Sequence, residues 1–248
     1  MSKSTATPVV AIVSCTRKHT YELVPALLSL ATHAPRAHVH LFADQPGRDA
    51  LAGCESHLHS ILGSLSVHTI EELGAPMLDY DPRLGPSPKF QTTRFACASA
   101  KLMLQAAPAL LPHPHVLALD VDTVANEDVG ELWRWTRSLR ASPTALWGLV
   151  RESSGDEGPL TFGKELKDVR PSHLPAREYY NTGVVLLYAS RLRALNLTHP
   201  AALLAQLSAA ATRGKGAWSD FGLGEQNLLN AWLAEHPGRV TQVRMTLA

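Results

Sequence analysis

The sequence predicts an α/β fold in which a mainly parallel central sheet is flanked by helices. Short apolar runs are typical of strands buried on both faces, and amphipathic segments between them have helical spacing. The first four elements alternate strand, helix, strand and helix, which favours a parallel sheet covered by helices. A chain of 248 residues with 45% hydrophobic residues can bury one large core. We therefore expect a single domain over residues 1–248.

The opening of the chain gives the clearest pattern. An apolar run at residues 9–13 predicts the first strand, and apolar residues about one turn apart predict a helix at 21–32. The residues Asp-Gln-Pro-Gly at 44–47 are typical of a turn. The other opening elements are a strand at 38–43, a helix at 49–62 and a strand at 66–70.

The rest of the chain alternates in the same way around two long polar segments. Residues 74–88 and 152–177 are irregular and rich in polar residues, glycine and proline, so we expect surface loops there. The run Val-Leu-Ala-Leu at 116–119 predicts a central buried strand. The remaining expected elements are helices at 95–107, 129–137, 200–212 and 225–234 and strands at 145–150, 184–187 and 238–243.

Composition excludes several classes of protein. A formal net charge of +1 gives no basic surface for nucleic acid or an anionic membrane. The cysteines Cys15, Cys54 and Cys97 are far apart without CxxC spacing, so we expect neither a zinc site nor a disulfide framework. Cys15 and Cys97 are expected to be small core residues. No apolar stretch is long enough for a membrane helix, which predicts a soluble chain.

Two aspartates directly follow the central strand. Alternation in an extended chain would put Asp120 and Asp122 on the same side. Packing explains such a pair poorly, because burying an uncompensated charge is costly. A hard divalent cation compensates two carboxylates and prefers oxygen ligands. The pair therefore predicts a metal site, the alternative being two solvated aspartates at the start of a loop.

Three kinds of chemistry use closely spaced aspartates. A calcium loop is excluded, because Val124 and Ala125 occupy positions where that loop needs a ligand and a glycine. A phosphatase with an aspartate nucleophile stays open as a remote alternative, although such enzymes place the motif on their first strand. Sugar transfer from a nucleotide-sugar is favoured, because a bound divalent ion can neutralise the pyrophosphate leaving group.

Four segments, in chain order, carry a specific resemblance. They are Cys97-Ala98-Ser99-Ala100-Lys101-Leu102, Leu119-Asp120-Val121-Asp122, Asn181-Thr182-Gly183-Val184 and Gly224-Glu225-Gln226-Asn227-Leu228-Leu229-Asn230. The segment at 97–102 resembles the helix that carries a donor-facing basic residue in one family, and the segment at 119–122 resembles the metal motif of that family. The segment at 181–184 resembles its Asn-x-Gly-Val segment, and the segment at 224–230 resembles its Asp-Gln-Asp-x-Leu-Asn helix start. That family is the retaining glycosyltransferases of family 8, in the branch of the glucoside xylosyltransferases. The resemblance covers most of the chain from residue 90 onward.

The resemblance implies a GT-A type nucleotide-diphospho-sugar transferase fold and a set of donor contacts. Asp120 and Asp122 would bind Mn2+ or Mg2+, and Asp120 would also touch the ribose. Lys101 would lie near the donor pyrophosphate or sugar. Asn181, with Gly183 beside it, would bind the donor sugar.

Further roles follow from the same resemblance. Gln226 would lie beneath the anomeric carbon and Glu225 would contact a sugar hydroxyl, although the family usually has Asp at the latter position. Glu152 matches a position that is often acidic. Cys15 and Thr16 occupy the place where the first strand meets the nucleotide. Residues 8–125 would form the nucleotide-binding half and residues 126–248 the half for donor sugar and acceptor.

The implied activity is metal-dependent transfer of xylose, glucose or galactose from a UDP-sugar to a hydroxyl acceptor, a glycan or glycoside. No carboxylate stands out as a covalent nucleophile, so we expect front-face attack with retention of configuration. The family's C-terminal His-x-x-Gly-x-x-Lys segment, which supplies a third metal ligand, is absent before Ala248. A non-catalytic sugar-nucleotide binder is therefore the main alternative. Secretory-pathway relatives carry an N-terminal anchor, which this sequence lacks, so location stays open.

Overall fold

The structure is a computed structural model of the whole chain. It describes residues 7–15, 20–73, 100–138, 143–151, 179–195, 197, 206 and 225–243. No helix in these ranges is long and apolar enough to cross a membrane.

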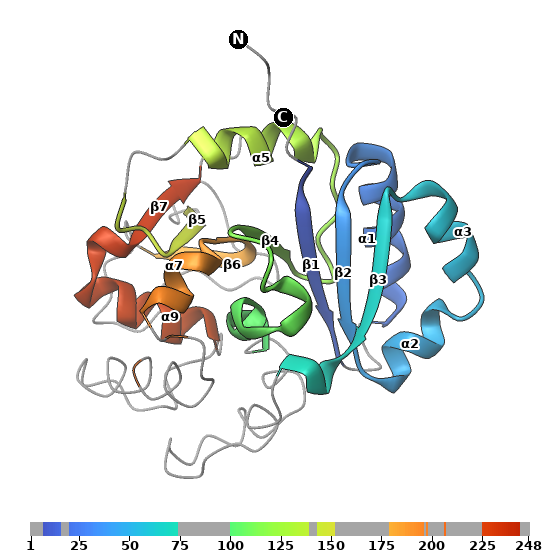
Figure 1. Cartoon of the computed structure of the whole chain (residues 1–248), viewed down its shortest axis with the longest axis horizontal. Helices are drawn as coiled ribbons and strands as arrows, with labels where there is room; N and C mark the ends of the chain where they lie inside the picture. The colour runs from blue at the N-terminus through green and yellow to red at the C-terminus, as the bar shows by residue number, and fades with distance from the viewer. Residues whose placement is uncertain are drawn as a thin grey trace, which may run out of the picture.

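A seven-stranded sheet forms the centre of the molecule, with strand order β3-β2-β1-β4-β6-β5-β7 (Figure 1). β1 and β4 lie side by side in the middle and are buried along their whole length, as expected for apolar strands covered on both faces. The strands are β1 (Val9–Ser14), β2 (His38–Ala43), β3 (Ser64–Thr69), β4 (Val116–Leu119), β5 (Trp147–Arg151), β6 (Tyr180–Leu187) and β7 (Val240–Val243).

Six of the seven strands run in the same direction, and β6 runs in the opposite one. β3, β2, β1 and β4 pair in parallel, and β5 pairs in parallel with β7. β6 is antiparallel to both of its neighbours, β4 and β5. The mainly parallel sheet is thus confirmed. The reversal of β6 brings the beginning of β6 to the carboxyl end of β4.

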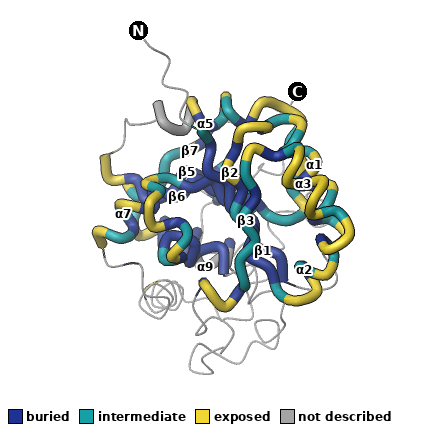
Figure 2. The backbone as a smooth tube through the Cα atoms, turned by 45° about the vertical axis from the view of Figure 1, so that its right-hand side comes forward, coloured by how far each residue is buried: buried dark blue, intermediate teal, exposed yellow. Residues whose placement is uncertain are grey.

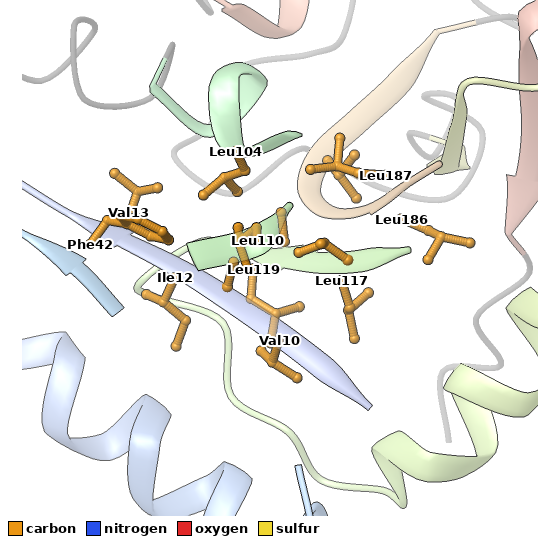
Figure 3. Close-up of a cluster of buried hydrophobic side chains, with 14 of the residues drawn as sticks. Val10, Ile12, Val13, Phe42, Leu104, Leu110, Leu117, Leu119, Leu186 and Leu187 are labelled. Atoms are coloured by element: carbon orange, nitrogen blue, oxygen red, sulfur yellow. The ribbon is translucent and has the colours of Figure 1, made fainter. Parts of the chain in front are cut away.

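Helices cover both faces of the sheet. Val10 and Ile12 of β1 lie on the side of the long helix α1 (Thr20–His33), and Leu104 lies on the other side (Figure 3). α1 packs against α2 (Gln45–Leu51) and α3 (Glu55–Ile61). Leu104 belongs to η5 (Lys101–Ala106), which contacts both β1 and β4. The other helices in the described ranges are η2 (Ile70–Leu73), η6 (Pro108–Leu110), α5 (Val129–Ser138), α7 (Ala189–Ala194), α9 (Glu225–Glu235) and η10 (Pro237–Arg239).

Most strands match the sequence prediction closely, whereas several helices differ. The helix expected at 49–62 is two short helices, because a turn at residues 52–54 separates α2 from α3. The turn expected at 44–47 is the start of α2, where Asp44 caps the helix by accepting a hydrogen bond from Gly47 N at 2.9 Å. Within the helix expected at 95–107, residues 101–106 form a 3-10 helix.

The expectation that the cysteines form no disulfide was wrong for Cys15. Cys15 is disulfide-bonded, and its partner lies outside the described residues. Cys54 is a free cysteine. Cys15 is also buried, so the expectation of a core position holds for its location but not for its chemistry. Wide spacing along the sequence did not indicate the bond, because the fold brings distant segments together.

Some expected elements lie outside the described residues. These are the loops at 74–88 and 152–177, residues 95–99 of the helix expected at 95–107, which include Cys97, and most of the helix at 200–212.

Candidate active site

The two aspartates follow β4, but the chain is not extended there. β4 ends at Leu119, and Thr123 N donates to Asp120 O at 3.0 Å, so residues 120–123 form a turn. The expectation that Asp120 and Asp122 share one side by strand alternation therefore has no basis in this backbone. Asp120 is half-buried and Asp122 is exposed. Binding of a metal by the two residues stays a prediction.

Asp120 is held by a buried lysine. Lys101 Nζ donates to Asp120 Oδ1 at 2.5 Å and to the Thr182 carbonyl oxygen at 2.6 Å. The Lys101 side chain is 3% exposed, whereas that of Asp120 is 38% exposed. Lys101 therefore does not extend to solvent. Its ammonium neutralises one face of the carboxylate and ties the end of β4 to the beginning of β6.

The beginning of β6 forms a cradle lined by oxygen atoms beside Asp120. Asp120 N donates to Gly183 O at 2.8 Å, and Asn181 Oδ1 accepts from Gly183 N at 2.7 Å. A Cβ atom on Gly183 would lie 2.9 Å from Asn181 Oδ1 and 3.5 Å from Asp120 Oδ2. An alanine here would force the Asn181 side chain to shift, because the first contact is closer than real Cβ atoms approach another heavy atom. The structure thus brings together Lys101, Asp120, Asn181 and Gly183.

The helix α9 is hydrogen-bonded to the first residues of β6 through two amide side chains. Gln226 Oε1 accepts from Thr182 N at 3.1 Å and from Thr182 Oγ1 at 3.3 Å. Asn230 Oδ1 accepts from Tyr180 N at 2.7 Å, and Asn230 Nδ2 donates to Tyr180 O at 2.8 Å and to Gln226 O at 2.8 Å. Because backbone N–H groups can only donate, these bonds fix which end of each amide is the oxygen.

Thr182 and Asn230 were given no role from the sequence. Thr182 links Lys101 to Gln226, since its carbonyl accepts from the lysine and its N–H donates to the glutamine. Asn230 lies four residues after Gln226, on the same face of α9. That i, i+4 spacing of two amides on one helix was the available signal.

Asp122 lies close enough to Tyr21, in the first turn of α1, for its charge to act on the phenol. Tyr21 is 67% exposed, and its pKa is raised by a hydrogen bond that its hydroxyl donates to Glu22, by the negative charge of Glu22, by burial and by the charge of Asp122. The aromatic ring and the second aspartate of the motif therefore share one exposed surface at the carboxyl end of the sheet. Ala125 N donates to Ser29 Oγ at 3.0 Å, which anchors the segment after the aspartates on the same helix.

The remaining predicted residues divide into three groups. Cys15 lies at the end of β1, next to Ser14, whose buried hydroxyl has no hydrogen-bond partner. The sulfur of Cys15 is part of a disulfide and so cannot act as a thiol ligand. Thr16 and Glu152 lie outside the described residues. Glu225 begins α9, but its side chain is likewise outside the description.

The donor atoms around Asp120 suit a hard divalent cation. Asp120 Oδ2 borders the open space at Gly183, and carboxylate oxygens are the ligands that Mn2+ and Mg2+ prefer. The positive charge of Lys101 is engaged by Asp120 Oδ1, so it orients the carboxylate while the second oxygen faces the cradle. Within the described ranges, no group of three or more His, Cys, Asp and Glu residues is arranged to hold a metal ion.

Comparisons with solved structures identify the fold. The chain superposes on mouse xyloside xylosyltransferase 1 in its apo form with a TM-score of 0.58 and 18% identity, covering 95% of this chain and 84% of that one. It superposes on the galactosyltransferase LgtC, solved with donor and acceptor sugar analogues, with a TM-score of 0.59 and 16% identity, covering 95% and 72%. The fold is the GT-A glycosyltransferase fold. The sequence prediction of that fold is confirmed.

Sequence comparison gives a weaker relationship. Human xylosyl- and glucuronyltransferase LARGE2 is 33% identical over 147 residues, which is 57% of this chain but only 18% of LARGE2. No family model matches the sequence. In this fold, η5 contacts Asp120 at the carboxyl end of β4 through Lys101, and α9 contacts the adjacent start of β6 through Gln226.

Proposed function

We propose that the protein is a metal-dependent retaining glycosyltransferase of family 8 that transfers xylose, glucose or galactose from a UDP-sugar to a hydroxyl acceptor on a glycan or glycoside. One observation carries the proposal above all others. A buried lysine orients an aspartate beside a glycine cradle at the carboxyl end of β4, the edge where α/β sheets bind ligands. The four motif segments and the GT-A fold support the same conclusion.

The roles of the described residues follow from their contacts. Asp120, with Asp122, would hold Mn2+ or Mg2+, which when bound supplies positive charge to the departing diphosphate. Lys101 keeps the Asp120 carboxylate in one orientation. Asn181 and Gly183 would receive the donor sugar, because their oxygen-lined cradle is the open space next to Asp120. Gln226 holds the backbone that forms this cradle.

Retention of configuration is part of the proposal. Gln226 Oε1 already accepts two hydrogen bonds from Thr182, so it would have to break both to attack a sugar carbon. We therefore assign Gln226 to positioning and the attack to the acceptor hydroxyl, on the face from which the diphosphate leaves. Mass-spectrometric trapping of a glycosyl-enzyme during turnover would contradict this assignment.

A sugar-nucleotide binder without turnover is the second candidate. It is favoured by the finding that the described residues contain no third metal-ligating side chain next to the two aspartates. The two candidates differ in one measurable step, because only the first releases UDP from a UDP-sugar.

The test measures UDP release from UDP-xylose, UDP-glucose and UDP-galactose, with and without Mn2+, together with calorimetric binding. We expect Mn2+-dependent hydrolysis of one donor and its loss in Asp120→Asn. Glu127→Gln is the matched control, because Glu127 is exposed on the same loop. Binding without UDP release would favour the second candidate. Release of phosphate from an aryl phosphate, abolished in Asp120→Asn, would instead support a phosphatase.

A further inference from the structure

A cluster of histidines lies on the η5 side of the sheet, next to the candidate site but not part of it. Val39 and Leu41 pair in register with Val10 and Ile12, which face α1. Side chains alternate along a strand, so His38 and His40 face the opposite side. His68 lies on the neighbouring β3, most of which is only half-buried (Figure 2). None of the roles proposed above uses these residues.

His40 and His68 are joined end to end. His40 Nδ1 lies 3.1 Å from His68 Nε2, the ring planes differ by 12°, and the ring centroids are 5.3 Å apart. For two rings that share a plane, the centroid separation equals the N···N distance plus one ring radius at each end, which fits these values. The contact is therefore an in-plane N–H···N hydrogen bond and not a face-to-face stack.

The chain continues to a carboxylate. His68 Nδ1 lies 3.3 Å from Glu72 Oε2, while the other oxygen of Glu72 accepts from Thr69 N at 3.0 Å. If His68 donates from Nδ1 to Glu72, its Nε2 accepts from His40 Nδ1. One hydrogen thus lies between the two rings. If both rings were imidazolium ions, two N–H groups would face each other and the bond would break.

The surroundings oppose a second positive charge. His113 packs edge-on against His40 at 5.6 Å between ring centroids, and His38 lies on the same face of β2. Burial, followed by the charges of His68, His113 and His38, lowers the pKa of His40 to about 4. Burial, followed by His38 and Arg193, also lowers the pKa of His113. Glu72 is the carboxylate that the described contacts give this cluster.

The cluster is mechanically connected to the candidate site. Glu72 belongs to η2, which packs against β2 and against η5. η5 carries Lys101, the lysine that orients Asp120. Arg193 donates from Nη1 to Gln105 O in η5 at 3.2 Å and from Nη2 to His113 O at 3.1 Å, so the same arginine contacts both regions.

We propose that the Glu72–His68–His40 chain is an acid-released latch that holds η2 against the sheet and supports η5, and that opens when the two histidines are both protonated. The latch does not depend on the function proposed above, because it rests on contacts outside the donor site. Its opening would loosen the packing beneath Lys101. The position of Lys101 in the candidate site would therefore be sensitive to mild acid.

The sign of the effect follows from the protonation of the folded and unfolded states. Between pH 6.5, the ordinary histidine pKa, and about 4, the unfolded chain binds a proton at His40 that the folded protein does not. Stability is therefore fully present above pH 6.5 and falls as the pH decreases through this range. One such proton changes the unfolding equilibrium constant by at most about tenfold per pH unit.

The first test compares urea unfolding of the wild type and of His40→Gln between pH 7.5 and 4.5. We expect the unfolding constant of the wild type to rise more steeply with acid, by up to about tenfold per pH unit beyond that of His40→Gln. His57→Gln is the control, because His57 is exposed on α3, and it should follow the wild type. Parallel pH dependences of the wild type and His40→Gln would overturn the proposal.

A second test needs no substitution. Amide hydrogen exchange of the wild type, corrected for the intrinsic effect of pH, is compared at pH 7.0 and 5.0. We expect acid to increase exchange in η2 and η5 and to leave α3 unchanged. Equal changes in all three helices, or no change in η2 and η5, would overturn the proposal. Both measurements are made without a sugar nucleotide, so failure of the proposed function would not affect them.

Discussion

At the scale of single residues, Gly183 determines how much room the candidate site has. Its missing Cβ leaves the space between Asn181 Oδ1 and Asp120 Oδ2 open. A methyl group at this position would change only the available space, since it would occupy the place where a donor oxygen or a cation is expected. The residue therefore offers a test of the site that changes no charge.

We expect Gly183→Ala to weaken binding of a UDP-sugar with Mn2+ by tenfold or more, because the added Cβ would lie 2.9 Å from Asn181 Oδ1. Isothermal titration calorimetry measures the affinity. Gly53→Ala is the control, since a Cβ there would meet nothing within 4 Å. Equal donor affinities of the two variants would show that the cradle is not the binding site.

Lys101 is the second residue of the candidate site whose contribution to stability can be measured by a single substitution. Lys101→Met removes the ammonium group that donates to Asp120 Oδ1 and to the Thr182 carbonyl. We expect a loss of about 1–3 kcal/mol in the free energy of unfolding, because a buried acceptor loses its partner while Asp120 can still reach water. Urea unfolding measures the loss, and Mn2+ affinity should fall as well.

Arg36→Met serves as a matched control, because Arg36 is exposed and its side chain forms no hydrogen bond or ion pair with the described residues. An unfolding free energy of Lys101→Met equal to that of Arg36→Met would contradict a structural role for the ammonium.

At the scale of elements, the pairing between α9 and β6 explains how an irregular strand start is stabilised. The register between β5 and β6 shifts at Leu149 and Val150, so the ladder is interrupted near the first residues of β6. The Asn230 side chain is hydrogen-bonded to both the N–H and the carbonyl of Tyr180, and the Gln226 side chain accepts from the N–H of Thr182. The two amides replace strand partners at this point.

We expect Asn230→Ala to lower the free energy of unfolding by about 2–4 kcal/mol, because one buried and two partly buried backbone groups lose the Asn230 amide as a partner at once. Chemical denaturation measures this loss. Gln242→Ala, on the exposed side of β7, should change stability by less than about 0.5 kcal/mol. If Asn230→Ala were as stable as Gln242→Ala, the amides would not act as substitutes for strand partners.

The sequence predicted the strands better than the helices, for a physical reason. The apolar run at 116–119 coincides with β4, because burial on both faces leaves little choice of residue type. The alternating pattern at 38–43 coincides with β2. The division of one expected helix into α2 and α3 depends on a turn around Gly53, which apolar periodicity does not reveal. The direction of β6 could not be predicted either, since strand direction depends on the whole topology.

The candidate site shows the same limit. Individual motifs identified Lys101, Asp120, Asn181 and Gln226, and the structure brings the first three together at one edge of the sheet, with Gln226 behind them. The contacts among them were not predictable. Lys101 was expected to face the donor, yet it bonds Asp120 and Thr182. The disulfide at Cys15 was missed because no local pattern announces it.

At the scale of the whole molecule, ligand binding should stabilise the folded state. A ligand at about one hundred times its Kd adds roughly 2.7 kcal/mol to the free energy of unfolding. For a chain of 248 residues, this corresponds to a rise in Tm of roughly 5–10 °C. We expect such a rise with UDP and Mn2+ together in differential scanning calorimetry, and a much smaller one for Asp120→Asn. An unchanged Tm at millimolar UDP and Mn2+ would argue against a uridine nucleotide site.

The reversed strand also has a consequence for how the chain folds. Lys101 joins Asp120, 19 positions away, to Thr182, 81 positions away, across the contact between β4 and β6. The strands β1, β2 and β3 pair over much shorter stretches of sequence, and their loops close at a lower entropic cost. The chain would then be able to bind a donor only after β6, from its second half, has paired with β4. Donor binding would report completion of folding, and a nascent or broken chain would not retain the ligand.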